Sequence, residues 1–302
     1  MDEIKVNNKK PLLPVKSDFV FRLIFGDQRN VDILADFLKS VLDIPIEEYD
    51  KLTIVDPHVK KESEDDKYGI LDVKVHTVSG SIVHVEIQLR VIPELKERTI
   101  FSQSKLVTEQ MASGKKYSII KRVVSIIITD ENFVTGNNGY HHQFRYRTKD
   151  GTEFTNLVEI NTLELSKLPR NADSTELWYW MKFIKSDDEE VFDMLAKRNP
   201  QMKKAVGVLK ELSADERTRM LYERREMARM DMASMVDGAR AEGHTAGHAE
   251  GHAEGHAEGH AEGRSEERAN VARNLLKINL PVEQIISVTG LAYEEVEALR
   301  ES

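Results

Sequence analysis

Two acidic residues on adjoining segments, Asp72 and Glu86, are the side chains in this chain best suited to chemistry. They lie in residues 70–91, GILDVKVHTVSGSIVHVEIQLR, where apolar and polar side chains alternate on both sides of a Val-Ser-Gly turn. Such period-two alternation predicts two half-buried strands joined as a hairpin. Two carboxylates on one face of a hairpin can together hold a divalent cation.

The turn sets the register of this hairpin. A two-residue loop at 79–80 would mix the apolar and polar faces, which disfavours it. A three-residue loop at 78–80 instead pairs Val73 with Val85 and keeps the apolar side chains on one face. Gly80 then takes the left-handed backbone conformation that a three-residue loop needs. The sequence therefore predicts the three-residue loop.

On the polar face, this register sets Asp72 directly opposite Glu86 and Lys74 opposite His84, with Cβ atoms ~5 Å apart in each pair. Two carboxylates at that separation repel by roughly 1 kcal/mol or more, even at an effective dielectric constant of about 20. A hard dication such as Mg²⁺ between them would remove the repulsion, and Gln88 on the same face could orient a water or a phosphate oxygen. The alternative is a polar face turned to solvent, where Lys74 neutralises its neighbours.

Composition limits the classes of protein to consider. The 302 residues are 40% apolar and 31% charged, an ordinary balance for a water-soluble chain. No apolar run approaches the ~18 residues of a membrane span, and the N-terminus lacks an apolar signal core. The absence of cysteine excludes disulfides and thiolate metal sites. We therefore expect a cytoplasmic protein that does not enter membranes.

The net charge of −9 is unevenly distributed. Residues 1–170 hold 25 Lys and Arg against 26 Asp and Glu, whereas the remainder holds 18 against 26. The acidity thus lies in the C-terminal part, and phosphate binding by the N-terminal part is permitted.

The elements around the hairpin predict an α/β (α+β) layer domain. Capping residues, apolar stripes and Gly or Pro boundaries give the order helix, strand, strand, strand, helix, strand. A second hairpin follows around the turn at 149–151, and the pattern becomes helical from 175 to about 236. Outside the first hairpin, the predicted helices are 17–26, 31–42 and 93–113, and the predicted strands are 52–55, 123–128, 142–148 and 152–160.

Residues 243–263 are a tetrapeptide repeat, GHTAGHAEGHAEGHAEGHAEG. Each Gly costs ~1 kcal/mol relative to Ala in a helix, and Glu residues four apart repel, so an isolated helix here is expected to be unstable. The repeat is either a flexible spacer or a helix stabilised by self-association along its glycine row. Histidines at i and i+4 could also chelate zinc or nickel.

The tail, from 264 to 302, is predicted to form short helices, with a turn at Thr289-Gly290 that is typical of a helix-turn-helix. Its last helix carries several glutamates, which disfavours entry into a DNA groove. A packing or oligomerising role for the tail is therefore favoured over DNA reading.

Asp72 followed by Glu86-x-Gln88, inside an αβββαβ order, resembles the PD-(D/E)XK nuclease superfamily. More narrowly, the chain is similar to the Rpn family of recombination-promoting nucleases and transposases, whose opening motif resembles SDFVFRLIFGD at 17–27. The glycine repeat followed by a helical tail is also typical of that family. Further similar residues on the family's long helix and its exit are Arg98, Gln110, Gly114 and Tyr117.

The resemblance implies a site. Asp72 and Glu86 would be metal ligands with the Ile87 backbone carbonyl as a third, and the metal would be Mg²⁺ or Mn²⁺. Gln88 takes the place of the superfamily's usual lysine, which removes a charge that could help to activate the attacking water. Leu71 stands where the superfamily name has proline.

Phosphate contacts are expected from Arg22, Lys74 and Arg98, which could offset charge building on a phosphate. Asp18 could supply a further acidic group.

The expected function is metal-dependent hydrolysis of DNA phosphodiester bonds, in recombination or mobile-element biology. The expected partners are DNA and further copies of the chain, joined through the C-terminal region. The alternative is a non-catalytic DNA-binding or oligomeric assembly protein on a nuclease-like scaffold. The corresponding divisions are a nuclease-like domain at 1–170, a helical region at 171–242, the repeat at 243–263 and the tail at 264–302.

Overall fold

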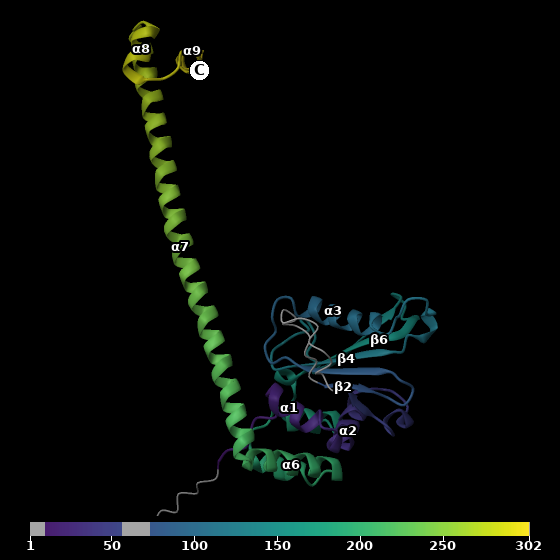
Figure 1. Cartoon of the computed structure of the whole chain (residues 1–302). Coiled ribbons are helices and arrows are strands. Elements are labelled where there is room, and N and C mark those ends of the chain that lie inside the picture. The colour runs from purple at the N-terminus through teal and green to yellow at the C-terminus, as the bar shows by residue number, and fades with distance from the viewer. Residues whose placement is uncertain (1–9, 56–72, 302) are drawn as a thin grey trace, which may run out of the picture. The chain divides into compact units, whose positions relative to one another are not determined.

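A six-stranded mixed sheet, with helices on both of its faces, forms the centre of the fold (Figure 1). The structure is a computed structural model and describes residues 10–55 and 73–301. The strand order is β1-β2-β3-β4-β6-β5, in which β3, β4 and β6 are parallel and the other neighbours are antiparallel. The strands are β1 Thr53–Val55, β2 Val73–His76, β3 Ile82–Ile87, β4 Val123–Thr129, β5 His141–Arg147 and β6 Glu153–Glu164.

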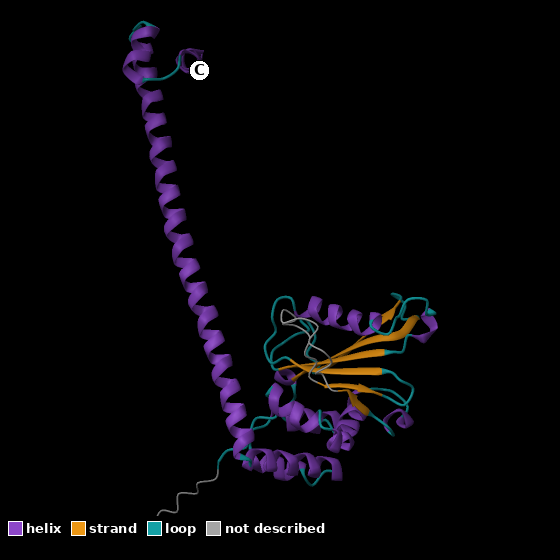
Figure 2. Cartoon of the chain, viewed as in Figure 1, coloured by secondary structure: helices purple, strands orange, loops and turns teal. Residues whose placement is uncertain are grey.

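The described helices before the tail agree in place with the predicted ones (Figure 2). The mixed α/β fold predicted from the sequence is confirmed, and the second hairpin extends the same sheet. The α-helices are α1 Asp18–Phe25, α2 Val31–Val41, α3 Leu95–Thr108, α4 Glu176–Lys185, α5 Glu189–Leu195, α6 Pro200–Ala214, α7 Glu216–Lys277, α8 Val282–Thr289 and α9 Tyr293–Glu301.

One face of the sheet packs against a helical layer that contains α1, α2, α4 and α6. Alternation directs Val73, Val75, Val83 and Val85 toward this layer, where all four side chains are buried. The helices contribute an aromatic cluster to the same core, with Trp180 at its centre. This face holds the main apolar core of the molecule.

Helix α3 covers the opposite face, where the sheet is more polar (Figure 1). Leu106 packs against Ile82 and Val123 at one end of the helix. The Gln103 side chain donates to the Glu159 carbonyl oxygen at 2.8 Å and so fastens the middle of the helix to β6. Helix α3 is therefore fixed over the strands that carry the polar side chains.

Helices α4 to α6 belong to the same compact unit as the sheet. The predicted boundary after residue 170 separates α4 from the sheet, yet α4 to α6 bury side chains in the same core as β2 to β4. The structure divides between Arg224 and Arg225, within α7. The helical pattern identified the helices after 170, but it carries no information about which surface they cover.

The second unit begins at Arg225 and contains most of α7, with α8 and α9. The tetrapeptide repeat is helical within α7. At the end of the chain, Ala272, Ile285 and Val296 form a small buried cluster, and Gly290 ends α8 in the left-handed conformation. Within residues 10–55 and 73–301, no helix combines the length and apolarity that crossing a membrane requires.

Candidate functional site

The hairpin of β2 and β3 has the predicted register. Val73 pairs with Val85 and Lys74 with His84, and the Thr77 N–H donates to the Ser81 carbonyl oxygen at 3.0 Å across the turn. Gly80 has a φ of +85°, the left-handed conformation expected of the third loop residue. The polar side chains of the hairpin therefore share the face covered by α3.

Glu86 is the central acidic group on this face. It lies near the end of β3, and its side chain is only 9% exposed. Its carboxylate forms an ion pair with the guanidinium of Arg98, which α3 presents from its first turns. A carboxylate so far removed from water needs a compensating cation, and Arg98 supplies one.

Gln88 joins the same group. The Arg98 guanidinium also donates to the Gln88 Oε1 at 3.3 Å, so one arginine bridges two side chains of the hairpin. The backbone N–H of Gln88 donates to the Ile128 carbonyl oxygen at 2.8 Å, which continues the parallel pairing beyond β3. The structure thus brings together three residues predicted from the sequence: Glu86, Gln88 and Arg98.

A second charge pair lies on the same face of the hairpin, two residues along the strands from Glu86. The Lys74 ammonium is 3.8 Å from the Glu109 carboxylate, and Lys74 lies opposite His84. Burial, with the positive charges of Lys74 and Arg98, lowers the pKa of His84 to about 3. His84 is therefore a neutral group between two cations, and neither ring nitrogen has a hydrogen-bond partner among the residues the structure describes.

Of the other predicted site residues, Asp18, Arg22 and Ile87 lie within the described ranges. Asp72 falls outside the described residues. Asp18 and Arg22 belong to α1, in the helical layer on the other face of the sheet from Glu86. Ile87, predicted to contribute its backbone carbonyl, directly follows Glu86 at the end of β3, and its side chain is buried in the main core. Of the predicted phosphate contacts, the structure brings only Lys74 and Arg98 to the face that carries Glu86.

The sequence did not indicate two features near Glu86. These are the contact of Glu109 with Lys74 and the burial that keeps His84 neutral. Strand alternation placed His84 on the same face as Glu86, but its burial depends on how α3 packs over the hairpin. Glu109 directly follows α3, and only that packing brings it to Lys74. The site as described combines carboxylate, amide, guanidinium and ammonium groups, which suits recognition of a phosphate beside a cation.

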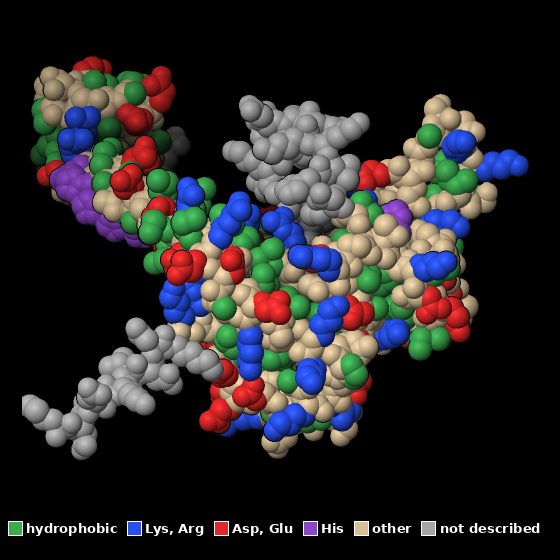
Figure 3. Space-filling view, turned by 60° about the horizontal axis from the view of Figure 1, so that its bottom comes forward, with side chains coloured by type: hydrophobic (Ala, Val, Ile, Leu, Met, Phe, Trp, Pro, Cys, Tyr) green, Lys and Arg blue, Asp and Glu red, His purple; other side chains and the backbone are tan. Residues whose placement is uncertain are grey.

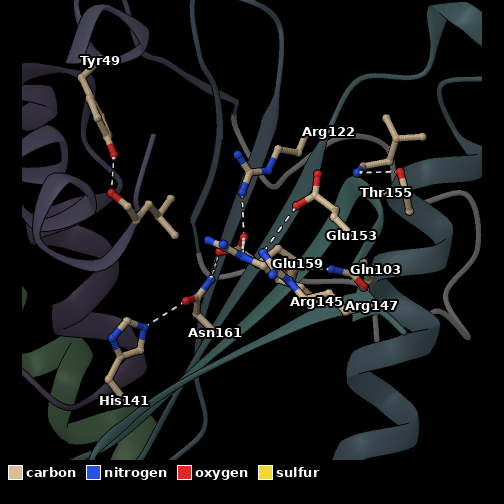
Figure 4. A network of polar contacts seen from close by, with 12 residues as sticks. Tyr49, Gln103, Arg122, His141, Arg145, Arg147, Glu153, Thr155, Glu159 and Asn161 are labelled. Atoms are coloured by element: carbon tan, nitrogen blue, oxygen red, sulfur yellow. Dashed lines mark hydrogen bonds and ion pairs between the residues drawn. The ribbon is translucent and has the colours of Figure 1, made fainter. Parts of the chain in front are cut away.

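A separate buried polar cluster surrounds Glu159 on β6 (Figure 4). Arg122 and Arg145 each place a guanidinium nitrogen 2.7 Å from the Glu159 carboxylate, and the Asn161 amide donates to it at 2.8 Å. His141 in turn contacts Asn161 at 2.9 Å. Alternation directs these side chains to the face opposite α3, so this cluster is distinct from the group around Glu86.

The Glu159 cluster predicts a pH dependence of stability. Burial raises the pKa of the Glu159 carboxyl, but Asn161 and the two arginines outweigh burial and hold that pKa below its ordinary 4.5. Its stabilisation is therefore complete above about pH 4.5 and is lost as the pH falls through the folded-state pKa. We expect Glu159→Gln to be less stable than the wild type near neutral pH, and the difference to shrink on acidification.

Urea unfolding of both proteins at a series of pH values measures this difference directly. A difference in unfolding free energy that stays constant down to about pH 3 would contradict the assignment of a lowered pKa to Glu159.

A comparison with protein families gives a match over most of the chain. The PD-(D/E)XK nuclease family transposase model matches residues 15–239, a span that contains the entire sheet and the group around Glu86. No curated protein and no solved structure matches the chain. The family match covers well over half of the sequence and agrees with the mixed α/β fold. The chain belongs to the PD-(D/E)XK nuclease family transposases.

Proposed function

We propose that this protein is a metal-dependent DNA endonuclease that hydrolyses phosphodiester bonds during recombination or movement of a mobile element. One observation supports the proposal above the others. In a chain of a nuclease-type transposase family, a buried carboxylate, Glu86, lies beside Gln88 and Arg98 at the end of a central strand. Buried charge of this kind is costly to fold and is typically retained for function.

The donor atoms near Glu86 fit a hard cation. The proposed ligands are the carboxylates of Asp72 and Glu86 and the backbone carbonyl of Ile87, all oxygen atoms, which is the set that Mg²⁺ and Mn²⁺ prefer. Within the described ranges, no three His, Asp or Glu side chains form a metal-binding group, so the proposal depends on Asp72. When bound, such a cation lowers the pKa of a coordinated water and offsets charge on the scissile phosphate.

The chain's own residues would divide the remaining work. The Gln88 amide can position the attacking water, because an amide both donates and accepts hydrogen bonds. The Arg98 guanidinium has five N–H donors and uses only some of them on Glu86 and Gln88, so it can also donate to a phosphate oxygen. Lys74 adds a second positive charge on the same face. We assign no role to Asp18 or Arg22 in this reaction.

Arg98 has a second consequence for the site. It competes with any cation for the Glu86 carboxylate, because both are attracted to the same oxygen atoms. With Glu86 engaged by a cation, the Arg98 guanidinium would be free to donate to the substrate. The ion pair thus holds the Glu86 side chain in place before the cation arrives.

A second candidate function is that of a DNA-binding assembly protein without catalysis. The observation that favours it is the same ion pair, since Arg98 already balances the charge of Glu86. Gln88 in the place of a lysine favours it too. In either case, we propose that the C-terminal region, with α7, joins copies of the chain, because the part of this helix at 243–263 has a glycine in every turn and gains stability by packing.

Incubation of supercoiled plasmid with the purified chain distinguishes the two functions. We expect nicked or linear product in Mg²⁺ or Mn²⁺ and none in EDTA, with DNA binding measured by gel shift in both conditions. DNA binding with no cleavage in either cation would support the assembly function and contradict the endonuclease.

A further inference from the structure

Five histidines follow one another along α7 at a spacing of four residues, and the nuclease proposal uses none of them. Their imidazoles form a continuous purple stripe on the surface of the helix in Figure 3. All five residues are exposed. We call them the histidine row: His244, His248, His252, His256 and His260.

The repeat sorts its residue types into separate rows around the helix. Each residue of an α-helix advances by about 100°, so residues four apart stay within about 40° of one another. Relative to His, the following Ala lies at about +100°, Glu at about 200° and Gly at about −100°. The carboxylates therefore lie almost opposite the imidazoles. The small residues Ala and Gly flank the histidine row, one type on each side.

Three of the four neighbouring pairs of imidazoles in the histidine row are close to one another. The ring centroids are 6.5 Å apart for His244 and His248, 6.4 Å for His252 and His256, and 4.3 Å for His256 and His260. In the described part of the chain, none of the five rings has a hydrogen bond or an ion pair. The rings are thus accessible and their nitrogen atoms are uncommitted.

Two imidazoles one turn apart on a helix can bind a single metal ion. Neutral imidazole nitrogen selects borderline cations such as Zn²⁺ and Ni²⁺, whereas Mg²⁺ requires oxygen ligands. The histidine row therefore differs in metal preference from the oxygen ligands proposed around Glu86. Since no third ligating side chain joins any pair within the described residues, water would complete the coordination.

A metal ion would also affect the stability of the helix. The six glycines of the repeat each cost ~1 kcal/mol relative to Ala, and the glutamates repel along their row. A cation held by histidines at i and i+4 requires the helical conformation between them. It therefore stabilises the helix by the free energy with which it binds the helical state in preference to the unfolded one.

We propose that the histidine row binds a borderline transition-metal ion, Zn²⁺ or Ni²⁺, between imidazoles one helical turn apart, and that this binding holds residues 243–263 in the helix. The site is separate from the one proposed for DNA hydrolysis and does not depend on that activity.

Two double variants of the full-length chain test the proposal. His248→Gln/His256→Gln leaves three histidines spaced eight apart and destroys every pair at i and i+4. His244→Gln/His260→Gln also leaves three histidines but retains two such pairs. Both variants leave the residues around Glu86 unchanged, so any difference between them reports on the histidine row alone.

Isothermal titration with Zn²⁺ and with Ni²⁺ is the measurement, together with helix content from circular dichroism. We expect the variant without pairs to lose affinity by about 100-fold or more, because the second ligand no longer acts from the same helix, and the control variant to lose only about two-fold. Metal should raise the helix content of the wild type and the control alone. Equal affinities in the two variants, or binding with no gain of helix in the wild type, would overturn the proposal.

Discussion

DNA cleavage by Glu86→Gln is expected to be lower than that of the wild-type chain by on the order of 100-fold or more. Replacing a residue that hydrogen-bonds to a metal ligand typically lowers metal affinity or activity by 10- to 100-fold. Loss of a ligating carboxylate should lower activity by at least as much. Glutamine keeps the shape of Glu86 and one oxygen that can accept from Arg98, so the change removes charge with little change of volume. Initial rates of plasmid nicking in Mg²⁺ measure the effect.

Glu109→Gln provides the matched control. Glu109 is another carboxylate near this face, its side chain is 47% exposed, and it pairs with Lys74 at 3.8 Å. Because an exposed ion pair contributes little to stability and Glu109 has no place among the proposed ligands, cleavage should stay within about three-fold of the wild type. Equal losses in Glu86→Gln and Glu109→Gln would indicate a general electrostatic effect and would contradict a specific role for Glu86.

Trp180→Ala is expected to destabilise the protein by about 3–5 kcal/mol, the largest effect we expect on stability. The Trp180 ring is fully buried, with centroids 5.7 Å from Phe25, 6.1 Å from Phe37 and 5.8 Å from Phe183. Its indole N–H donates to the Asp36 carboxylate at 3.1 Å. The substitution therefore leaves a cavity between α4 and the N-terminal helices and removes a partly buried hydrogen bond.

Urea unfolding monitored by circular dichroism gives the change in free energy. Phe154→Ala is the control, because that ring is 81% exposed and its removal should change stability by less than about 0.5 kcal/mol. A loss below about 1 kcal/mol for Trp180→Ala would show that α4 is not part of the core that stabilises the sheet.

The hairpin was predictable from the sequence because two independent signals agree there. Strict alternation fixes which side chains share a face, and Gly80 fixes the loop, so the pairing of Val73 with Val85 follows. The packing of α4 to α6 was not predictable in the same way. Trp180 and Phe183 indicate a buried helix, but nothing in their spacing says that the buried side meets α1 and α2.

The group around Glu86 was predictable in part. Glu86 and Gln88 follow from alternation and from the resemblance to nucleases, and Arg98 from the resemblance alone. Its direct contact with Glu86 depends on the angle at which α3 crosses the hairpin, which no local pattern records. The same is true of Glu109 beside Lys74 and of the burial that keeps His84 neutral.

Cleavage of supercoiled plasmid in Mg²⁺ by purified Asp72→Ala protein tests most directly whether two neighbouring carboxylates serve one cation. Measured beside the wild type, Glu86→Gln and the double variant, the proposal predicts loss of cleavage in each single variant and no further loss in the double variant, because both changes disable one unit. Undiminished cleavage by Asp72→Ala would contradict the proposed site.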